Sequence, residues 1–184
     1  MTHRSGGRST PTGSLDGLAG HVPQSYIDGA KAASEAFRKA GVRHVLVGGL
    51  AVGINGYPRS TKDIDFMVGD EAFEFHGLIV EPRAGLPMRY SGITIDWVSL
   101  EPDERAGLEE FLIDALPGEV PVMEIEPLIA MKLLAGRQKD QADIVELIKA
   151  GADIGSISSF VEKRFPKKLT MLRNLITRAN VEEE

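Results

Sequence analysis

The chain of 184 residues contains no cysteine. It can therefore form neither disulfide bonds nor thiolate metal sites, and any metal ion must be bound by carboxylates, histidines or backbone oxygens. Long apolar runs are missing as well, because no stretch approaches the roughly 20 residues that span a bilayer. No hydrophobic signal-peptide core follows the N-terminus. These absences predict a soluble, cytoplasmic protein with no membrane partner.

Positive charge is in the minority, since 21 Lys and Arg stand against 27 Asp and Glu, giving a formal net charge of −6. This balance argues against a protein coated with basic residues for nucleic-acid binding. The average hides a basic stretch near the C-terminus, where Glu162 is the only acid among six cations: Lys163, Arg164, Lys167, Lys168, Arg173 and Arg178. A solvated helix face would explain this stretch, and the alternative is a docking patch for an anionic partner such as RNA.

The remaining composition is globular, with 42% apolar residues, and the length suits one well-buried domain with a small appendage. Residues 1–20 are rich in Gly, Ser, Thr and Pro and are predicted to be a flexible tail. Residues 21–125 mix helix and strand patterns, whereas residues 126–180 contain helix patterns alone. We therefore predict an α/β (α+β) fold, in which a helical C-terminal subdomain packs on a small mixed-sheet core.

Hydrophobic periodicity and turn residues place the expected elements along the chain. Strands are expected at residues 42–47, 63–68 and 93–100, with weaker ones at 77–82 and 87–92 and an extended segment at 120–123. Helices are expected at residues 26–40, 50–56 and 101–116, and in three or four segments after residue 126. The breaks between those segments should fall at Gly136, Gly151 and Pro166, because glycine and proline end helices.

Two aspartates stand one residue apart where a loop becomes the strand DIDFMV. The side-chain period of two sends Asp63 and Asp65 to the same strand face, about 7 Å apart along the backbone. Asp96 is the only charge in the apolar strand ITIDWVSL, and burying it unpaired would be costly. If the two strands are neighbours, the three carboxylates converge and could bind one or two divalent cations, Mg²⁺ or Mn²⁺. The simpler alternatives are that Asp63 caps a turn and that Asp96 pairs with an arginine.

A glycine pair, Gly48 and Gly49, separates the strand VRHVLV from the short helix after it. With no side chain in the way, backbone N–H groups at such a junction can approach a phosphate. The surrounding residues match neither the P-loop nor the dinucleotide fingerprint. A tight turn is therefore the simpler interpretation of the pair taken alone.

The run GGLAVGINGYPRSTKDIDF resembles the nucleotidyltransferase superfamily of the DNA polymerase beta type, and most closely its minimal nucleotidyltransferases and AbiEii-like type IV toxins. After the Gly-Gly turn, the family pattern Gly-x-Arg-x-Thr-x-Asp-hydrophobic-Asp corresponds to Gly56, Arg59, Thr61, Asp63 and Asp65. The resemblance implies that the two aspartates, together with Asp96 as the third acid, bind the catalytic metal. It also implies that Gly48 and Gly49 seat the nucleotide phosphates, and that Arg59 and Thr61 hold these phosphates or order the loop. A plain salt bridge from Arg59 to an aspartate is the alternative.

The resemblance resumes in EPLIAMKLLAGRQKDQADIVEL, where toxin-like members carry a lysine, an arginine and a Lys/Arg-Asp-x-x-Asp run. The matching residues are Lys132, Arg137, Lys139, Asp140 and Asp143. Lys132 is a lone charge on an apolar helix, so it either extends along the surface to solvent or points into a site, where it would neutralise a leaving pyrophosphate. Asp140 is expected to cap the next helix, to line the nucleotide site, or to orient Lys132 by an ion pair.

Together these features predict a metal-dependent nucleotidyltransferase that moves NMP from an NTP to an acceptor hydroxyl. Its catalytic residues would be Asp63, Asp65, Asp96 and Lys132. The resemblance adds tRNA as a candidate acceptor and a cognate antitoxin as a candidate protein partner. Two alternatives stay open: a non-catalytic nucleotide-binding or toxin–antitoxin module, and an antibiotic adenylyltransferase.

Overall fold

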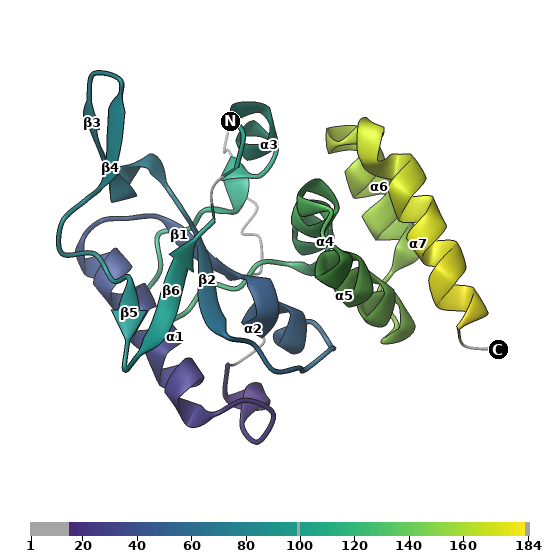
Figure 1. The fold of residues 1–184 in the computed structure, drawn as a ribbon, viewed down its shortest axis with the longest axis horizontal. Helices are drawn as coiled ribbons and strands as arrows, with labels where there is room; N and C mark the ends of the chain where they lie inside the picture. The colour runs from purple at the N-terminus through teal and green to yellow at the C-terminus, as the bar shows by residue number, and fades with distance from the viewer. Residues whose placement is uncertain (1–14, 99, 183–184) are drawn as a thin grey trace, which may run out of the picture.

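The computed structural model describes residues 15–98 and 100–182. A four-stranded sheet with the order β1-β2-β6-β5 forms the centre of the N-terminal part (Figure 1). Its strands are β1 (His44–Val47), β2 (Asp63–Val68), β5 (Arg89–Tyr90) and β6 (Ile93–Trp97). Strand β2 runs antiparallel to β1 and parallel to β6, whereas β5 runs antiparallel to β6. The predicted α/β (α+β) fold with a small mixed sheet is confirmed.

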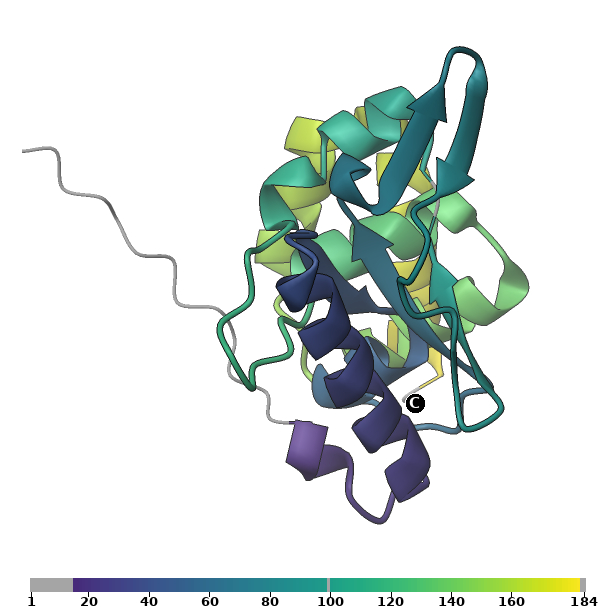
Figure 2. The same cartoon turned by 90° about the vertical axis from the view of Figure 1, so that its left-hand side faces the viewer.

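Helix α1 (Gln24–Lys39) covers one face of this sheet, as Figure 2 shows. The buried ring of Phe66 on β2 meets Phe37 of α1, with 5.4 Å between the ring centroids. Trp97 of β6 packs on the same Phe37 ring at 5.8 Å. Because successive side chains of a strand alternate between faces, the aspartates of β2 and β6 lie on the opposite face, away from this aromatic core.

Helix α2 (Gly48–Ile54) follows β1 without a loop. Gly48 has φ +66°, a left-handed conformation that glycine adopts without strain, and it turns the chain sharply from strand into helix. The helix buries Leu50, Ala51 and Val52, and it packs on β1 and β2 and on the helix α4 (Ile125–Ala135). Through this packing α2 joins the sheet to the C-terminal helices.

The segment between β2 and β6 differs from its prediction. A hairpin of β3 (Phe73–His76) and β4 (Ile79–Pro82) projects from the body (Figures 1 and 2). Strand β4 falls within the expected segment 77–82, whereas β3 was not expected, although its four residues FEFH alternate aromatic and polar side chains with the period of a strand. Phe73 anchors the hairpin to the body by an edge-on contact with Trp97, at 5.7 Å.

The single helix predicted at residues 101–116 is wrong. Helix α3 covers only Pro102–Ala106, and a 3-10 turn, Glu109–Phe111, follows it. A glycine, Gly107, stands at the end of α3, and its position against the ring of Phe165 leaves no room for a side chain. The later segment 120–123 is extended as predicted, and it pairs with the free edge of β1, where the N–H of Leu46 donates to Pro121 at 2.7 Å.

Four helices make up the C-terminal part, at the right of Figure 1: α4, α5 (Gln138–Lys149), α6 (Ile154–Arg164) and α7 (Leu169–Val181). Their breaks fall where they were predicted. Gly136 and Gly151 have positive φ angles of 64° and 96°, and Pro166 begins a 3-10 turn between α6 and α7. Glycine ends a helix in this way because it reaches the left-handed conformation without a Cβ penalty.

The predicted tail needs a correction at its C-terminal end. Residues 1–14 lie outside the described part of the chain, but Leu15–Leu18 form a 3-10 turn in which both leucines are buried. Leu18 packs on Gly53 of α2, so this turn belongs to the core. Among the helices of the described residues, none has the length and apolar character needed to cross a membrane.

Candidate functional site

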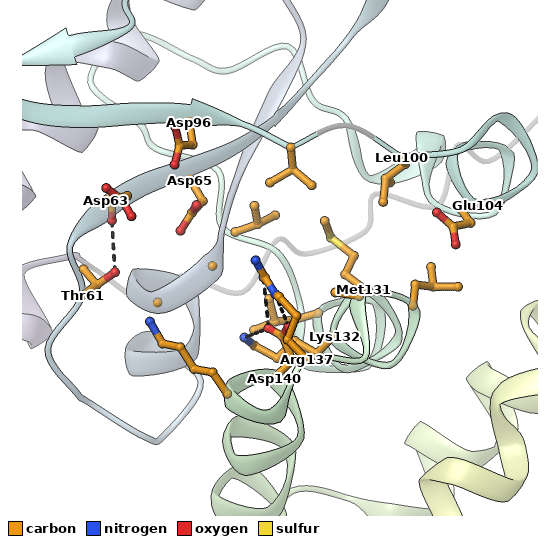
Figure 3. Close-up of a pocket in the computed structure, with 18 of the residues that line it drawn as sticks. Thr61, Asp63, Asp65, Asp96, Leu100, Glu104, Met131, Lys132, Arg137 and Asp140 are labelled. Atoms are coloured by element: carbon orange, nitrogen blue, oxygen red, sulfur yellow. Dashed lines mark hydrogen bonds and ion pairs between the residues drawn. The ribbon is translucent and has the colours of Figure 1, made fainter.

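A cleft of about 560 Å³ opens between the sheet, the start of α2 and the helices α4 and α5 (Figure 3). All the residues that were predicted for the site line it, at positions 48, 49, 59, 61, 63, 65, 96, 132 and 140. They come from β2, β6, the loop before β2, the start of α2, and the helices α4 and α5. The fold therefore brings residues that are far apart in the sequence to one concave surface, the kind of place where small-molecule sites form.

The three aspartates lie on two neighbouring strands. Strand β2 pairs with β6 in parallel, and the register sets Asp65 directly beside Asp96 and Asp63 beside Thr94. Residues opposite one another in neighbouring strands point to the same face, so the three carboxylates share the face that borders the cleft. Figure 3 shows them together at one end of it.

These carboxylates have no positive partner in ion-pair contact among the described residues. Burial raises the pKa of the Asp65 carboxyl, and the charges of Asp96 and Asp63 raise it further. A hydrogen bond from the Gly49 backbone N–H and the charge of Lys132 offset only part of this effect. The alternative that Asp96 pairs with an arginine is wrong for the arginines that the structure describes. The acids form a pocket of negative charge that no cation of the described chain neutralises by direct contact, in which Asp63 and Asp65 are half-buried whereas Asp96 is exposed.

A divalent cation is the natural counter-charge for such a pocket, and the donor set agrees with it in kind. Carboxylate oxygens are the ligands that Mg²⁺ prefers. In the described part of the chain, however, no three Asp, Glu or His side chains stand close enough together to enclose a metal ion by themselves. This arrangement suits Mg²⁺, which usually takes one or two carboxylates and keeps its other positions for water and substrate phosphates. Asp65 with Asp63 or Asp96 would hold it, and the protein alone would not complete its coordination.

The glycine pair has a packing reason that the sequence did not reveal. A side chain at Gly48 would collide with the carboxylate of Asp65, and a Cβ at Gly49 would lie 2.6 Å from the hydroxyl oxygen of Thr61. Both glycines therefore make room for side chains of the site. Thr61 in turn donates a hydrogen bond to the backbone oxygen of Asp63 at 3.1 Å, which fixes the loop as it enters β2.

A second charged group, opposite the acids, forms an ion-pair network of five residues: Arg59, Lys132, Arg137, Asp140 and Asp143. Its centre is Asp143, which accepts two hydrogen bonds from the guanidinium of Arg59, at 2.5 and 2.6 Å, and one from Lys132 at 2.6 Å. Asp140 accepts from Lys132 at 3.3 Å and from Arg137 at 2.6 Å. The network links the loop before β2 to α4 and α5.

Most of this network is buried, so its ion pairs are strong and each buried charge needs a partner. The side chains of Lys132 and Asp143 are only 6% and 2% exposed. Burial raises the pKa of Asp143, but the hydrogen bonds from Arg59 and Lys132 outweigh it, so the carboxyl titrates below its ordinary range. Buried charges persist in proteins when each has a partner, and every member here has at least one.

These contacts decide between the alternatives for the helical residues. The helix-capping alternative for Asp140 is wrong, because Arg137 holds the N-cap position of α5 and Asp140 lies in its first turn. The ion pair between Asp140 and Lys132 is present, as is a salt bridge of Arg59, whose partner is Asp143. Arg137 has a side chain 77% exposed at the cleft, so it is the most accessible cation of the network.

Two features of the site were missed. Asp143 was matched to the family pattern and expected at most to help the first turn of its helix, so its place at the centre of the ion-pair network was not predicted. The other feature is the far end of the cleft, where Leu100, Glu104 and Met131 join the lining. Neither the family models nor the curated proteins with which the sequence was compared gave a match.

Proposed function

We propose that this protein is a metal-dependent nucleotidyltransferase, which transfers a nucleoside monophosphate from an NTP to an acceptor hydroxyl and releases pyrophosphate. The observation that supports it best is the group of three uncompensated carboxylates on β2 and β6, at the edge of a cleft whose other side carries cations. Such a site attracts a cation on one side and an anion on the other. A metal-bound nucleoside triphosphate offers both.

Each group of residues in the cleft has a separate role in this reaction. Asp63 and Asp65 would hold the cation, which polarises the phosphate under attack when it is bound. Asp96 stands beside Asp65 and is the candidate base that takes the proton of the acceptor hydroxyl. Lys132 and Arg137 line the opposite wall and would balance the negative charge that grows on the leaving pyrophosphate.

The acceptor in this proposal is RNA, with tRNA as the first candidate. Lys163, Lys167 and Arg173 are exposed on and between α6 and α7 and form no ion pair among the described residues. A surface of this kind binds phosphate backbones by charge, independently of sequence. The AbiEii-like resemblance extends the proposal to a cognate antitoxin as partner and to a cytoplasmic location.

A transfer assay tests the proposal. The protein is incubated with Mg²⁺ and each α-labelled NTP, with total tRNA or without added acceptor, and the label is followed on RNA and on the protein. We expect labelled product from the wild type and a loss of roughly 10²-fold or more in Asp65→Asn, because a ligand of the metal is removed. Asp103→Asn, which neutralises an exposed acid outside the cleft lining, should keep the activity.

The same assay separates the alternatives. A wild-type protein that folds and binds NTP but labels no acceptor would make the chain a non-catalytic nucleotide-binding module. Labelling of an aminoglycoside, with none on RNA or protein, would make it an antibiotic adenylyltransferase. Equal activity in Asp65→Asn and the wild type would show that the carboxylates serve the fold alone.

A further inference from the structure

The cleft continues beyond the aspartates into a part with a different lining, which we name the apolar half. Figure 3 shows Leu100, Glu104 and Met131 at the end of the cleft away from the three acids. Its walls are aliphatic side chains of the segment after β6 and of α4: Val98, Leu100, Leu128, Met131 and Leu134. Glu104 of α3 is the one charged side chain among the cleft-lining residues of this half.

Such walls suit a flat, weakly polar group. Leu128 and Met131 are buried, at 1% and 8% exposure, so they form a firm surface, and the thioether of Met131 adapts to the shape of what it contacts. Aliphatic walls of this kind hold the faces of nucleobases, whereas they offer nothing to a phosphate or to a group with several positive charges. The chemistry of the cleft thus changes from charged to apolar along its length.

Glu104 is held in place with one carboxylate oxygen committed. Its Oε2 accepts a hydrogen bond from the backbone N–H of Glu101 at 3.2 Å, as part of a capping box at the start of α3. No residue of the described chain donates a hydrogen bond to Oε1. Glu104 is half-buried, and an ionised carboxylate can only accept, so this oxygen can take an N–H or O–H from whatever enters the apolar half.

We propose that the apolar half is a nucleobase subsite and that Oε1 of Glu104 accepts a hydrogen bond from an exocyclic amino group of the base. This inference rests on the proposed function, because it assigns the base end of the same nucleotide. Cytosine carries an amino group where uracil carries a carbonyl oxygen, and that oxygen would repel the carboxylate. Glu104 therefore selects amino-bearing bases against uracil.

CTP and UTP test this subsite, because the exocyclic group at C4 (with the protonation of the adjacent N3) is the difference between them. In the presence of Mg²⁺ the wild type should bind UTP about tenfold more weakly than CTP, from the loss of one hydrogen bond to a charged acceptor. In Glu104→Gln the preference for CTP should be lost or reversed, because the amide oxygen keeps the bond from Glu101 and the NH2 group that then faces the cleft can only donate, to the uracil oxygen. Glutamine also preserves the capping box, so the variant keeps the start of α3.

Two controls and one further variant separate the contribution of the base from those of charge and of the phosphates. Asp103→Asn removes the same charge from the same helix without touching the cleft lining, and it should leave the ratio of CTP to UTP binding unchanged. Inorganic triphosphate carries the phosphates without a base, so its binding should be equal in the wild type and in Glu104→Gln. Leu100→Ala should weaken the binding of CTP and leave inorganic triphosphate unaffected.

The outcomes distinguish this inference from the proposed function. Equal binding of CTP and UTP by the wild type, or an unchanged ratio in Glu104→Gln, overturns the base subsite while the binding of both nucleotides still supports the proposed function. If neither CTP nor inorganic triphosphate binds with Mg²⁺, the proposed function itself fails. An aminoglycoside that binds the wild type and is lost in Glu104→Gln, with CTP unaffected, would assign Glu104 to a cationic acceptor instead and overturn the subsite.

Discussion

The two charged groups that face each other across the cleft differ in their electrostatic environment: one has acids without ion-pair partners among the described residues, and the other has acids paired with cations. On the sheet side, Asp63, Asp65 and Asp96 are side by side without a cation, and the pKa of Asp65 is raised by burial and by its neighbours. On the helix side, Asp143 is surrounded by cations and its pKa is lowered despite burial. An aspartate is therefore destabilised in its ionised form on the sheet side and stabilised in its ionised form on the helix side.

This difference separates residues that hold the fold from residues kept for a ligand. A carboxylate whose partners are all within the protein stabilises the structure and has little left to offer. A carboxylate without partners costs stability, and such a cost is typical of functional sites. The comparison predicts that equivalent substitutions on the two sides will change stability in opposite directions.

The largest effect is expected in the ion-pair network. Asp143→Asn leaves the buried charge of Lys132 and the half-buried charge of Arg59 with too little compensation, so the free energy of unfolding should fall by about 3 kcal/mol or more. Urea unfolding followed by circular dichroism measures it. Glu146→Gln on the same helix, where the acid is partly exposed, is the control and should change stability by less than about 1 kcal/mol. A small effect of Asp143→Asn would show that the network contributes little to the stability of the fold.

Addition of a divalent cation should act on the other side of the cleft. Mg²⁺ or Mn²⁺ at 100 times its dissociation constant should stabilise the folded protein by about 2.7 kcal/mol, because it binds the native state and relieves the repulsion among the acids. Thermal unfolding with and without the metal measures the shift. The shift should vanish in the double variant Asp63→Asn/Asp65→Asn and persist in Asp103→Asn. A shift of equal size in the double variant would place the cation elsewhere.

Asp65→Asn should have a smaller effect of the opposite sign to Asp143→Asn. The substitution removes a half-buried charge that faces two like charges, so without a divalent cation it should stabilise the protein by roughly 1 kcal/mol, the usual size of a single-substitution effect. Urea unfolding in the presence of a chelator is the measurement. A loss of stability as large as that of Asp143→Asn would show that the Asp65 carboxylate stabilises the fold as Asp143 does, which contradicts the proposed difference between the two sides.

The smallest effect is the order in which the carboxyls titrate. The folded-state pKa of Asp143 is lowered, so its contribution to stability is present above the ordinary value of 3.8 and is lost as the pH falls through its folded pKa. The folded-state pKa of Asp65 is raised, so its contribution falls as the pH rises from 3.8 through its folded pKa. Carbon-13 NMR of the side-chain carboxyls, without divalent cations, should find Asp65 titrating above 3.8 and Asp143 below it. The reverse order would contradict the assignment of the two environments.

Local patterns predicted the parts of the fold that depend on local chemistry. The left-handed glycines at positions 136 and 151 ended their helices as expected, because the penalty for that conformation is a property of the residue itself. The alternation in DIDFMV likewise placed both aspartates on one face. The helix predicted at residues 101–116 failed because the many helix-forming residues on both sides of Gly107 outweighed it in the prediction, whereas in the structure Gly107 and its close packing on Phe165 end the helix.

The sequence by itself thus determined that Asp63 and Asp65 share a strand face and where the chain turns, and it supplied the list of candidate site residues. Only the tertiary structure decided their partners. Arg59 and Asp143 are 84 residues apart and meet because α5 packs beside the loop that leads into β2. Glu104 joins the cleft because α3 lies at its far end, and Gly48 is needed because the carboxylate of Asp65 fills the space beside it. Spacing along a chain fixes the direction of a side chain, but the distance between two elements depends on how they pack, and no local pattern contains that information.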